Sequence, residues 1–200
     1  MAERIISQKH LSRPVAPAPS APIVRHLLDM VEHYAGAAQL VVARAQIAHT
    51  AATLRDPRWT VALTSRAFAR LFAHCIWVLE AWASAQDRRA PLAKPEFDLL
   101  CHRVITCRSL RDVIERAIHF TAMVGPRAGT LSLTLDQDQA TLGMASNRSI
   151  RNSCAYLCDL TGLSSFHRLF GWLIGEEIAL SAVNMAYPPL LDPALAAHVM

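Results

Sequence analysis

Five cysteines and nine histidines are the side chains of this sequence that could bind a metal ion. Cys154 and Cys158 are four residues apart, so on a helix they share one face, and His167 lies beyond a turn. A second group is Cys101, His102 and Cys107. Structural zinc sites favour tighter C-x-x-C spacings than these, and a buried free cysteine packs as a small hydrophobic residue. We therefore expect neither a metal site nor a cofactor.

Nucleophilic catalysis has the right residue types but not the right pattern. Asp159, Ser164, Ser165 and His167 are close in sequence, yet a triad depends on spatial geometry, and no G-x-S-x-G elbow surrounds either serine. The seven glycines are scattered, so no glycine-rich phosphate loop is present. The sequence predicts that the chain is not an enzyme.

The stretch 155–176 has the spacing of a DNA-reading helix-turn-helix unit. It predicts a helix, a Gly-Leu-Ser turn at 162–164, and a second helix that begins at Ser164 and ends at Gly175. Ser165, His167 and Arg168 could face base edges, but the rest of the second helix is apolar nearly all round. Its apolar residues are Phe166, Leu169, Phe170, Trp172, Leu173 and Ile174. This composition favours a helix packed in a core.

A ligand pocket needs apolar walls and a few polar groups that fix orientation. The aromatic and polar residues expected nearest the junction of helix and sheet are the candidate ligand-binding residues: Phe120, Tyr156, His167, Arg168 and Trp172. Arg168 could pair with the carboxylate of a ligand or with Asp159 on the neighbouring helix. Each of the five could equally be a core or surface residue.

The first half of the chain reads as helical. Residues 1–22 form a Pro/Ala-rich stretch that we interpret as a flexible leader. Helical periodicity then predicts helices over 23–36, ending at Gly36, and about 38–48. Asp56-Pro57 is a predicted break.

Ser65 is the predicted N-cap of the strongest helix, whose apolar stripe runs from Phe68 to Trp82. A polar loop is expected at 84–95, followed by an apolar helix-like run at 97–106. Ser109 and Asp112 form an S-x-x-D capping signature for a helix over about 110–124, which Gly125-Pro126 ends.

The period then changes from helix to strand. Strict alternation at 130–135 and 139–144, around a turn at 136–138, predicts a β-hairpin, and 177–187 is predicted as another strand. A helix is expected from Pro193. The fold class is therefore α+β: an N-terminal helical half followed by a small antiparallel β-sheet with packed helices. Because so small a sheet leaves an edge bare, we expect further strands from beyond Met200 or from another chain.

Composition places the chain among globular intracellular proteins. An apolar fraction of 52% argues against disorder, and a net charge of +4 is too small for a surface that coats nucleic acid. An odd number of cysteines and a non-secretory N-terminus predict reduced thiols and a cytoplasmic location. The most apolar helix, 68–83, contains Arg70, His74 and Glu80, so no membrane span is expected.

Three blocks in this order resemble the N-terminal, arabinose-binding-like sensing domain of AraC-type transcriptional regulators. They are D-L-L-C-H-R-V-I-T-C-R-S-L-R-D-V-I-E-R-A at 98–117, the hairpin at 130–144, and D-L-T-G-L-x-x-x-H-R-L-x-G-W-L-I-G-E-x-I at 159–178 followed by V-N-M-A-Y-P-P at 183–189. The resemblance covers about residues 22–191.

The resemblance implies that residues 23–200 form a domain that binds a small effector and dimerises. In that family, DNA is bound by a C-terminal region of two helix-turn-helix units, which would lie beyond Met200. We therefore expect a fragment that lacks the distal part of the sensing domain and the helix-turn-helix region. The regulator would contact DNA only through that missing helix-turn-helix region. The alternative is a stand-alone interaction module that modulates a full-length regulator.

Overall fold

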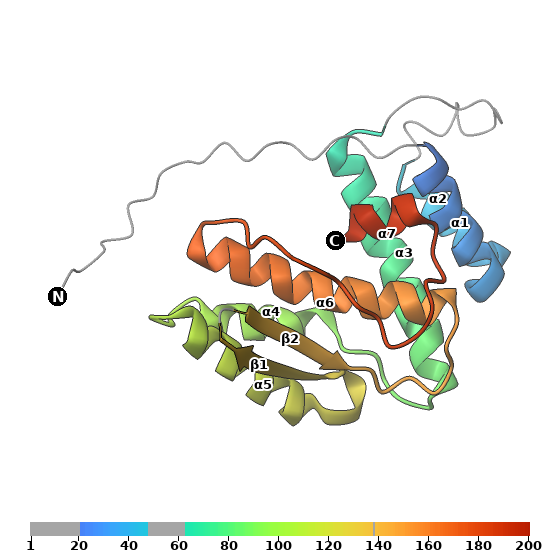
Figure 1. Ribbon diagram of the computed structural model, residues 1–200. Coiled ribbons are helices and arrows are strands. Elements are labelled where there is room, and N and C mark those ends of the chain that lie inside the picture. The colour runs from blue at the N-terminus through green and yellow to red at the C-terminus, as the bar shows by residue number, and fades with distance from the viewer. Residues whose placement is uncertain (1–20, 48–62, 138) are drawn as a thin grey trace.

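The computed structural model describes residues 21–47, 63–137 and 139–200 (Figure 1). The predicted break at Asp56-Pro57 and most of the predicted leader lie outside these residues. Helix α1 begins at Ala21, so the last two residues assigned to the leader are helical. Among the described helices, none combines the length and the apolar character needed to cross a membrane.

Four helices form the helical half of the molecule: α1 (Ala21–Ala35), α2 (Ala37–Ala45), α3 (Ser65–Gln86) and α7 (Pro193–Val199). Gly36 separates α1 from α2 with φ at 86°, a conformation that favours glycine, so the predicted stop is confirmed. The helices enclose a large apolar core with the N-terminal half of α6 (Ser153–Ile174). Its fully buried members include Leu27, Leu71, Leu79, Leu157 and Leu195.

Thr64, not the predicted Ser65, caps the N-terminus of α3. The Thr64 hydroxyl accepts a hydrogen bond from the Ala67 amide at 3.2 Å, and its backbone is extended. Ser65 is the first helical residue. Both residues carry a hydroxyl that could cap the helix, and the backbone conformation decides between them. The predicted N-cap was therefore wrong by one position.

The sheet half consists of α4 (Lys94–Val104), α5 (Leu110–Val124) and two strands, β1 (Thr130–Asp136) and β2 (Gln139–Ala145). The strands pair in antiparallel register from Thr130 opposite Ala145 to Asp136 opposite Gln139, which confirms the hairpin. The Ser109 hydroxyl accepts from the Asp112 amide at 3.1 Å, so the predicted cap of α5 is also confirmed. A short 3-10 turn, η2 (Gly125–Arg127), follows α5.

The predicted loop at 84–95 is shorter than expected, because α3 continues to Gln86 and α4 begins at Lys94. Pro95 lies in the first turn of α4, where backbone N–H groups have no partner within the helix, so a residue without an N–H is tolerated. The Glu96 carboxylate accepts from the Ala93 amide at 2.8 Å and lies beside the Arg127 guanidinium. These contacts start the helix three residues before the predicted position.

Helix α6 runs unbroken from Ser153 to Ile174, so the predicted turn at 162–164 is wrong. Gly162 lies within the helix, where an added Cβ would stand 3.1 Å from the Met144 Cε atom of β2. The glycine therefore permits close approach of the helix and the hairpin rather than a change of chain direction. The helix ends where predicted, at Gly175, whose φ is 71°.

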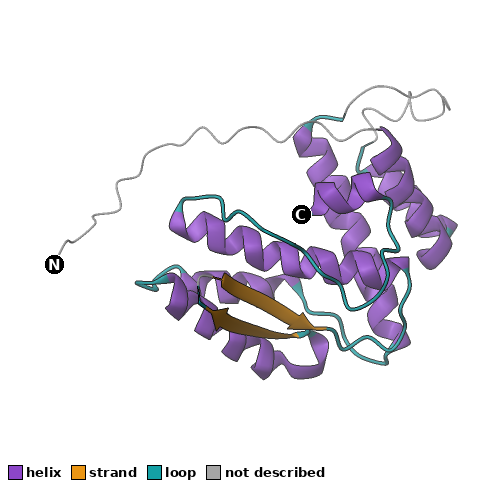
Figure 2. Ribbon diagram, in the orientation of Figure 1, coloured by secondary structure: helices purple, strands orange, loops and turns teal. Residues whose placement is uncertain are grey.

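The segment 177–187 is not the predicted strand, since no β-pairing includes it. It runs back along α6 (Figure 2), with the Ile178 carbonyl 2.7 Å from His167 Nε2 and the Tyr187 hydroxyl 3.0 Å from Asp159 Oδ2. Leu180 and Val183 remain 46% and 39% exposed, so the alternating pattern buries no sheet face here. Alternation alone did not reveal that the partner would be a helix.

The architecture is α+β, as predicted, with α6 shared between two apolar cores (Figure 1). The N-terminal half of α6 packs on the helical half, while Phe166 and Phe170 enter the smaller core beneath the hairpin. Among the described residues the sheet has two strands, and the expectation of further strands stays a prediction.

Candidate functional site

A cavity of about 320 Å³ opens between α3, α6 and α7. Its lining residues are Ser65, Phe68, Ala69, Phe72, Thr161, Ser164, Ser165, Arg168, His198 and Val199. This volume lies at the small end of the range found for small-molecule sites. We call it the α3–α6–α7 cavity.

Two helical stripes of identical spacing form the walls. From α3 come residues 65, 68, 69 and 72, and from α6 come residues 161, 164, 165 and 168. Positions i, i+3, i+4 and i+7 share one face of a helix, so each set points the same way. The α3 stripe supplies Phe68 and Phe72, while the α6 stripe supplies three hydroxyls and one guanidinium. The walls therefore pair an apolar face with a polar one.

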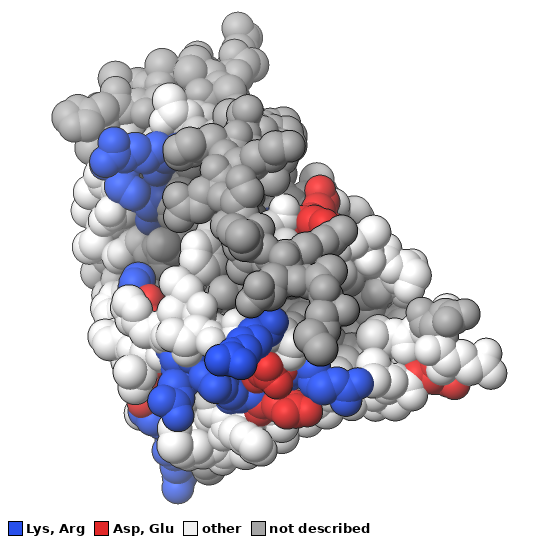
Figure 3. All heavy atoms as spheres, turned by 90° about the vertical axis from the view of Figure 1, so that its left-hand side faces the viewer, with Lys and Arg blue, Asp and Glu red and all other residues white. Residues whose placement is uncertain are grey.

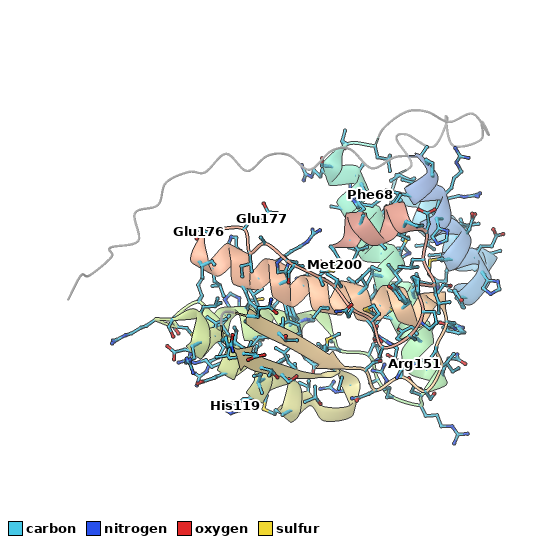
Figure 4. The ribbon with its side chains drawn as sticks, viewed as in Figure 1. Phe68, His119, Arg151, Glu176, Glu177 and Met200 are labelled. Carbon is cyan, nitrogen blue, oxygen red and sulfur yellow. The ribbon has the colours of Figure 1, made fainter. Side chains whose placement is uncertain are left out.

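Helix α7 closes the cavity and is held there by α6. The Val199 carbonyl accepts hydrogen bonds from the Ser164 hydroxyl at 2.6 Å and from Arg168 Nη2 at 3.0 Å. The His198 ring packs edge-on against Phe68, with the ring centroids 4.8 Å apart. Figure 4 shows Phe68 next to α7, with Met200 at the end of that helix. A molecule in the cavity would thus touch α7 as well as α3 and α6.

The electrostatics of the cavity are set by one cation. Among the described lining residues none is acidic, and Arg168 forms no ion pair with a described residue. Burial and the neighbouring Arg168 guanidinium lower the pKa of His198, so that ring is neutral at pH 7. The Thr161 hydroxyl oxygen is buried without a hydrogen-bond partner among the described atoms. The site offers positive charge and an unmet hydrogen bond.

The structure does not bring the five predicted ligand residues together. Arg168 alone lines the cavity. Phe120 is buried in the sheet-side core, and Tyr156 is buried in the helical core against Tyr187. Trp172 is 54% exposed, and His167 binds the Ile178 carbonyl.

The predicted pairing of Arg168 with Asp159 is wrong. The two residues are nine positions apart on one continuous helix, which is about two and a half turns, so they face opposite sides. Asp159 instead accepts from Arg148 Nε at 2.7 Å. The prediction assumed a turn between the two residues, and the unbroken helix removes it.

Sequence reasoning missed Phe68, Phe72, Thr161 and His198 as lining residues. The repeat of Thr161, Ser164, Ser165 and Arg168 at helical spacing was a usable signal, because a polar stripe inside an otherwise apolar helix needs a reason. The contribution of α7 had no such signal, since it depends on the path of the chain after Gly175.

Three of the five cysteines, Cys75, Cys154 and Cys158, are buried packing residues. Burial raises the pKa of the Cys75 thiol to about 12, and a hydrogen bond with Cys154 together with burial raises that of Cys158. Cys154 Sγ donates to the Leu79 carbonyl at 3.4 Å. Within the described ranges, no three His, Cys, Asp or Glu side chains lie close enough to hold a metal ion.

A second polar group, the Arg148 cluster, consists of Glu80, Arg148, Asp159 and Tyr187. Arg148 follows β2 and reaches both Glu80 of α3 and Asp159 of α6 with a side chain that is 8% exposed. Burial opposes its charge, but the neighbouring carboxylates outweigh that effect and raise its pKa. The cluster leaves no cavity of ligand size, because the nearby pocket measures about 10 Å³.

Charge is mixed in the lower part of the face shown in Figure 3, and a separate group of Lys and Arg side chains lies at its upper left. On the face shown in Figure 3, Lys and Arg side chains lie next to Asp and Glu side chains in the lower part, with uncharged surface around them. The described part of that face therefore presents no continuous basic surface of the kind that tracks a nucleic-acid backbone.

An α+β body with a ligand-sized cavity between its helices has the architecture of a small-molecule-binding domain. Residues 36–199 match the family described as the arabinose-binding domain of AraC transcription regulator, N-term, and the chain belongs to that family. Searches of curated proteins and of solved structures found no match. Family membership assigns the chain to effector-binding domains of transcription regulation.

Proposed function

We propose that this chain is the ligand-sensing and dimerisation domain of an AraC-type regulator, and that its effector binds in the α3–α6–α7 cavity. The single observation that carries the proposal is the shared wall: the cavity is closed by α7, whose Val199 carbonyl is bound by two of the lining residues, Ser164 and Arg168. Occupancy of the cavity would change contacts on all three helices at once.

Helix α7 is the proposed route from effector to output. In AraC-type regulators the helix-turn-helix region that binds DNA is C-terminal to the sensing domain, and α7 is the most C-terminal helix that the structure describes. A ligand that contacts Arg168 or His198 alters the groups that hold α7 in place. The effector would control DNA binding by favouring one position of this helix.

Homodimerisation is supported by apolar side chains that the fold leaves uncovered. Val41 and Val42 of α2 are 67% and 44% exposed. The buried residues of this short helix are Leu40 and Ala43. An isologous contact between two copies would cover such a surface. Changing both Val41 and Val42 to Ser should shift a dimer toward monomer, which analytical sedimentation would measure. A dimer that is unchanged by these substitutions would place the interface elsewhere.

We propose that the chain has no catalytic activity. The groups that could serve a nucleophilic mechanism are engaged in structural bonds: the Ser164 hydroxyl donates to Val199, Ser165 donates to the Thr161 carbonyl, and His167 binds Ile178. The five cysteines are free, which fits a proposed cytoplasmic location.

Thermal-shift screening tests the sensing function. A ligand that binds only the folded chain raises the melting temperature as its concentration rises. We expect a concentration-dependent increase with at least one compound from a panel of sugars, amino acids, aromatic acids and aliphatic acids. A well-folded sample that responds to none of them would contradict the proposal, and sequence-specific DNA binding by these 200 residues in a gel shift would contradict the assignment of DNA contact to another region.

A further inference from the structure

The lining of the α3–α6–α7 cavity is poor in groups that recognise sugars. A sugar carries a hydroxyl on almost every carbon, and each hydroxyl removed from water must find a partner in the site. Among the described lining residues there is no Asp, Glu, Asn or Gln. The hydroxyls of Ser164 and Ser165 already donate to backbone carbonyls, whereas the Thr161 hydroxyl is buried without a partner among the described atoms. The fourth lining hydroxyl belongs to Ser65, which is exposed.

The apolar side of the cavity is large by comparison. Phe68 is buried in the wall and Phe72 lies one turn further along α3. Their rings are 5.8 Å apart between centroids and tilted by 38°, so they present a continuous aromatic surface. Such a surface gains free energy from an apolar ligand body and gains little from a polyol.

Arg168 provides a head-group site at the mouth of the cavity. Its side chain is exposed, and only Nη2 donates to described residues, to the carbonyls of His198 and Val199. A guanidinium has five N–H donors in a planar fork, so Nε and Nη1 remain for a second acceptor. Helix α3 also begins at the cavity with Ser65 and has no acidic residue in its first turn, which adds positive potential.

We propose that the α3–α6–α7 cavity binds a small monocarboxylate with an apolar body, and not a sugar. The carboxylate lies on Arg168, and the body packs against Phe68 and Phe72. This proposal rests on the proposed sensing function, because it names the class of effector for the same site. Since Arg168 also holds the Val199 carbonyl, the carboxylate and α7 share one guanidinium.

Isothermal titration of the purified chain tests the ligand class with defined probes. The acids are benzoate, phenylacetate, hexanoate and octanoate; benzyl alcohol and 1-hexanol are neutral counterparts, and L-arabinose is the sugar. We expect at least one acid to bind about tenfold or more tightly than its neutral counterpart, because a bidentate guanidinium contact is lost in the alcohol. L-Arabinose is expected to give no binding heat.

Three variants and one control, Arg111→Gln, locate the site. Arg168→Gln should weaken binding of the acid about tenfold or more and leave the alcohol unchanged, whereas Arg111→Gln, on an exposed arginine of α5, should change neither. Arg168→Lys keeps a donor for the Val199 carbonyl but loses the fork, so it should weaken acid binding while α7 stays in place. Ala69→Leu fills the cavity from an exposed position and should weaken acid and alcohol alike.

The outcomes separate the ligand class from the sensing function. Binding of L-arabinose that Ala69→Leu abolishes would overturn the monocarboxylate proposal and support sensing. Acid binding that Arg168→Gln and Arg111→Gln affect equally would overturn the role of Arg168. No binding by any probe, together with no thermal response to the wider panel, would overturn both.

Discussion

The helical half and the hairpin of this molecule bury their apolar side chains to very different extents. In the helical half, α1, α3, α6 and α7 surround side chains that are completely buried, such as Leu27, Leu71 and Leu79. In the hairpin only Leu131 is buried, and Leu135 is 56% exposed. The candidate ligand site lies in the helical half, where a change at one helix is passed on through close contacts.

The two halves are joined by α6 and by the Arg148 cluster. Arg148 follows the hairpin and pairs with Glu80 of α3 and Asp159 of α6. The Tyr187 hydroxyl, in the segment that runs back along α6, donates to the Asp159 carboxylate as well. Charges this deeply buried are stable only while each keeps its partner. The sheet half is therefore held on the helical half both by the packing of Phe166 and Phe170 of α6 and by this junction, so loss of the junction should weaken the attachment.

Removal of Arg148 should have one of the largest effects on stability. Arg148→Met leaves Asp159 without its cation in a buried site and leaves Glu80 with Arg89 alone at 3.9 Å, which is expected to lower the free energy of unfolding by about 3 kcal/mol. Urea denaturation followed by circular dichroism and by tryptophan fluorescence measures the loss. We also expect the two signals to separate, because the halves lose their junction.

Lys94→Met is the matched control for Arg148→Met. The Lys94–Asp98 pair is exposed at both side chains, so its loss should cost about 0.5 kcal/mol or less. Equal losses in the two variants would refute the role of the Arg148 cluster as a junction.

The contrast in burial predicts unequal costs for the same truncation in α3 and in the hairpin. Leu79→Ala removes a completely buried side chain of α3 and should cost about 3 kcal/mol. Leu135→Ala, in the hairpin, should cost about 0.5 kcal/mol or less, since that side chain is mostly exposed. Denaturant midpoints of both variants provide the measurement, and similar midpoints would show that the hairpin contributes as much packing as α3.

Two glycines of α6 test how the helix connects the halves. Gly175→Ala places a Cβ at a φ of 71° and should cost about 1 kcal/mol. Gly162→Ala gains helix propensity but meets the flexible end of Met144 at 3.1 Å, so its net effect should lie within about 0.5 kcal/mol. Thermal melts compare them. A cost at Gly162 as large as that at Gly175 would indicate a turn there, as the sequence had suggested.

Local features of the fold were predictable because each depends on a few neighbouring residues. Ser109 caps α5, Gly36 and Gly175 end helices, and the alternation around 136–138 forms the hairpin. Each is decided by backbone preference or by periodicity within one element.

The candidate site was only partly predictable because it is assembled from distant elements. Arg168 is the one predicted ligand residue that lines the cavity, but Phe68 precedes it by 100 positions and His198 follows by 30. The segment 177–187 shows the same limit: its alternation is real, yet its path along α6 is set by His167 and Asp159. Which elements meet is a tertiary property that no local pattern contains.

The smallest effect that we predict is a loss of stability in mild acid at His198 of α7, the helix that closes the cavity. Burial and Arg168 lower the pKa of His198 below its ordinary value of 6.5, so protonation favours the unfolded chain. The stability contributed by neutral His198 is fully present above about pH 6.5 and is lost as pH falls through the folded pKa. The groups that face this ring are Arg168 and Phe68.

Asp87, which lies outside the cavity, responds in a lower pH range. For Asp87, beside the Arg148 cluster, burial opposes ionisation, but hydrogen bonds from Ser149 and the charge of Arg89 lower its pKa below 3.8, so its contribution is lost only in stronger acid. His198→Gln should therefore flatten the decline in stability between pH 6.5 and pH 5, whereas His119→Gln, on the outer side of α5 (Figure 4), should not. Urea titrations at each pH measure the slopes. A slope that His198→Gln leaves unchanged would mean that α7 does not carry the mild-acid response of the helical half.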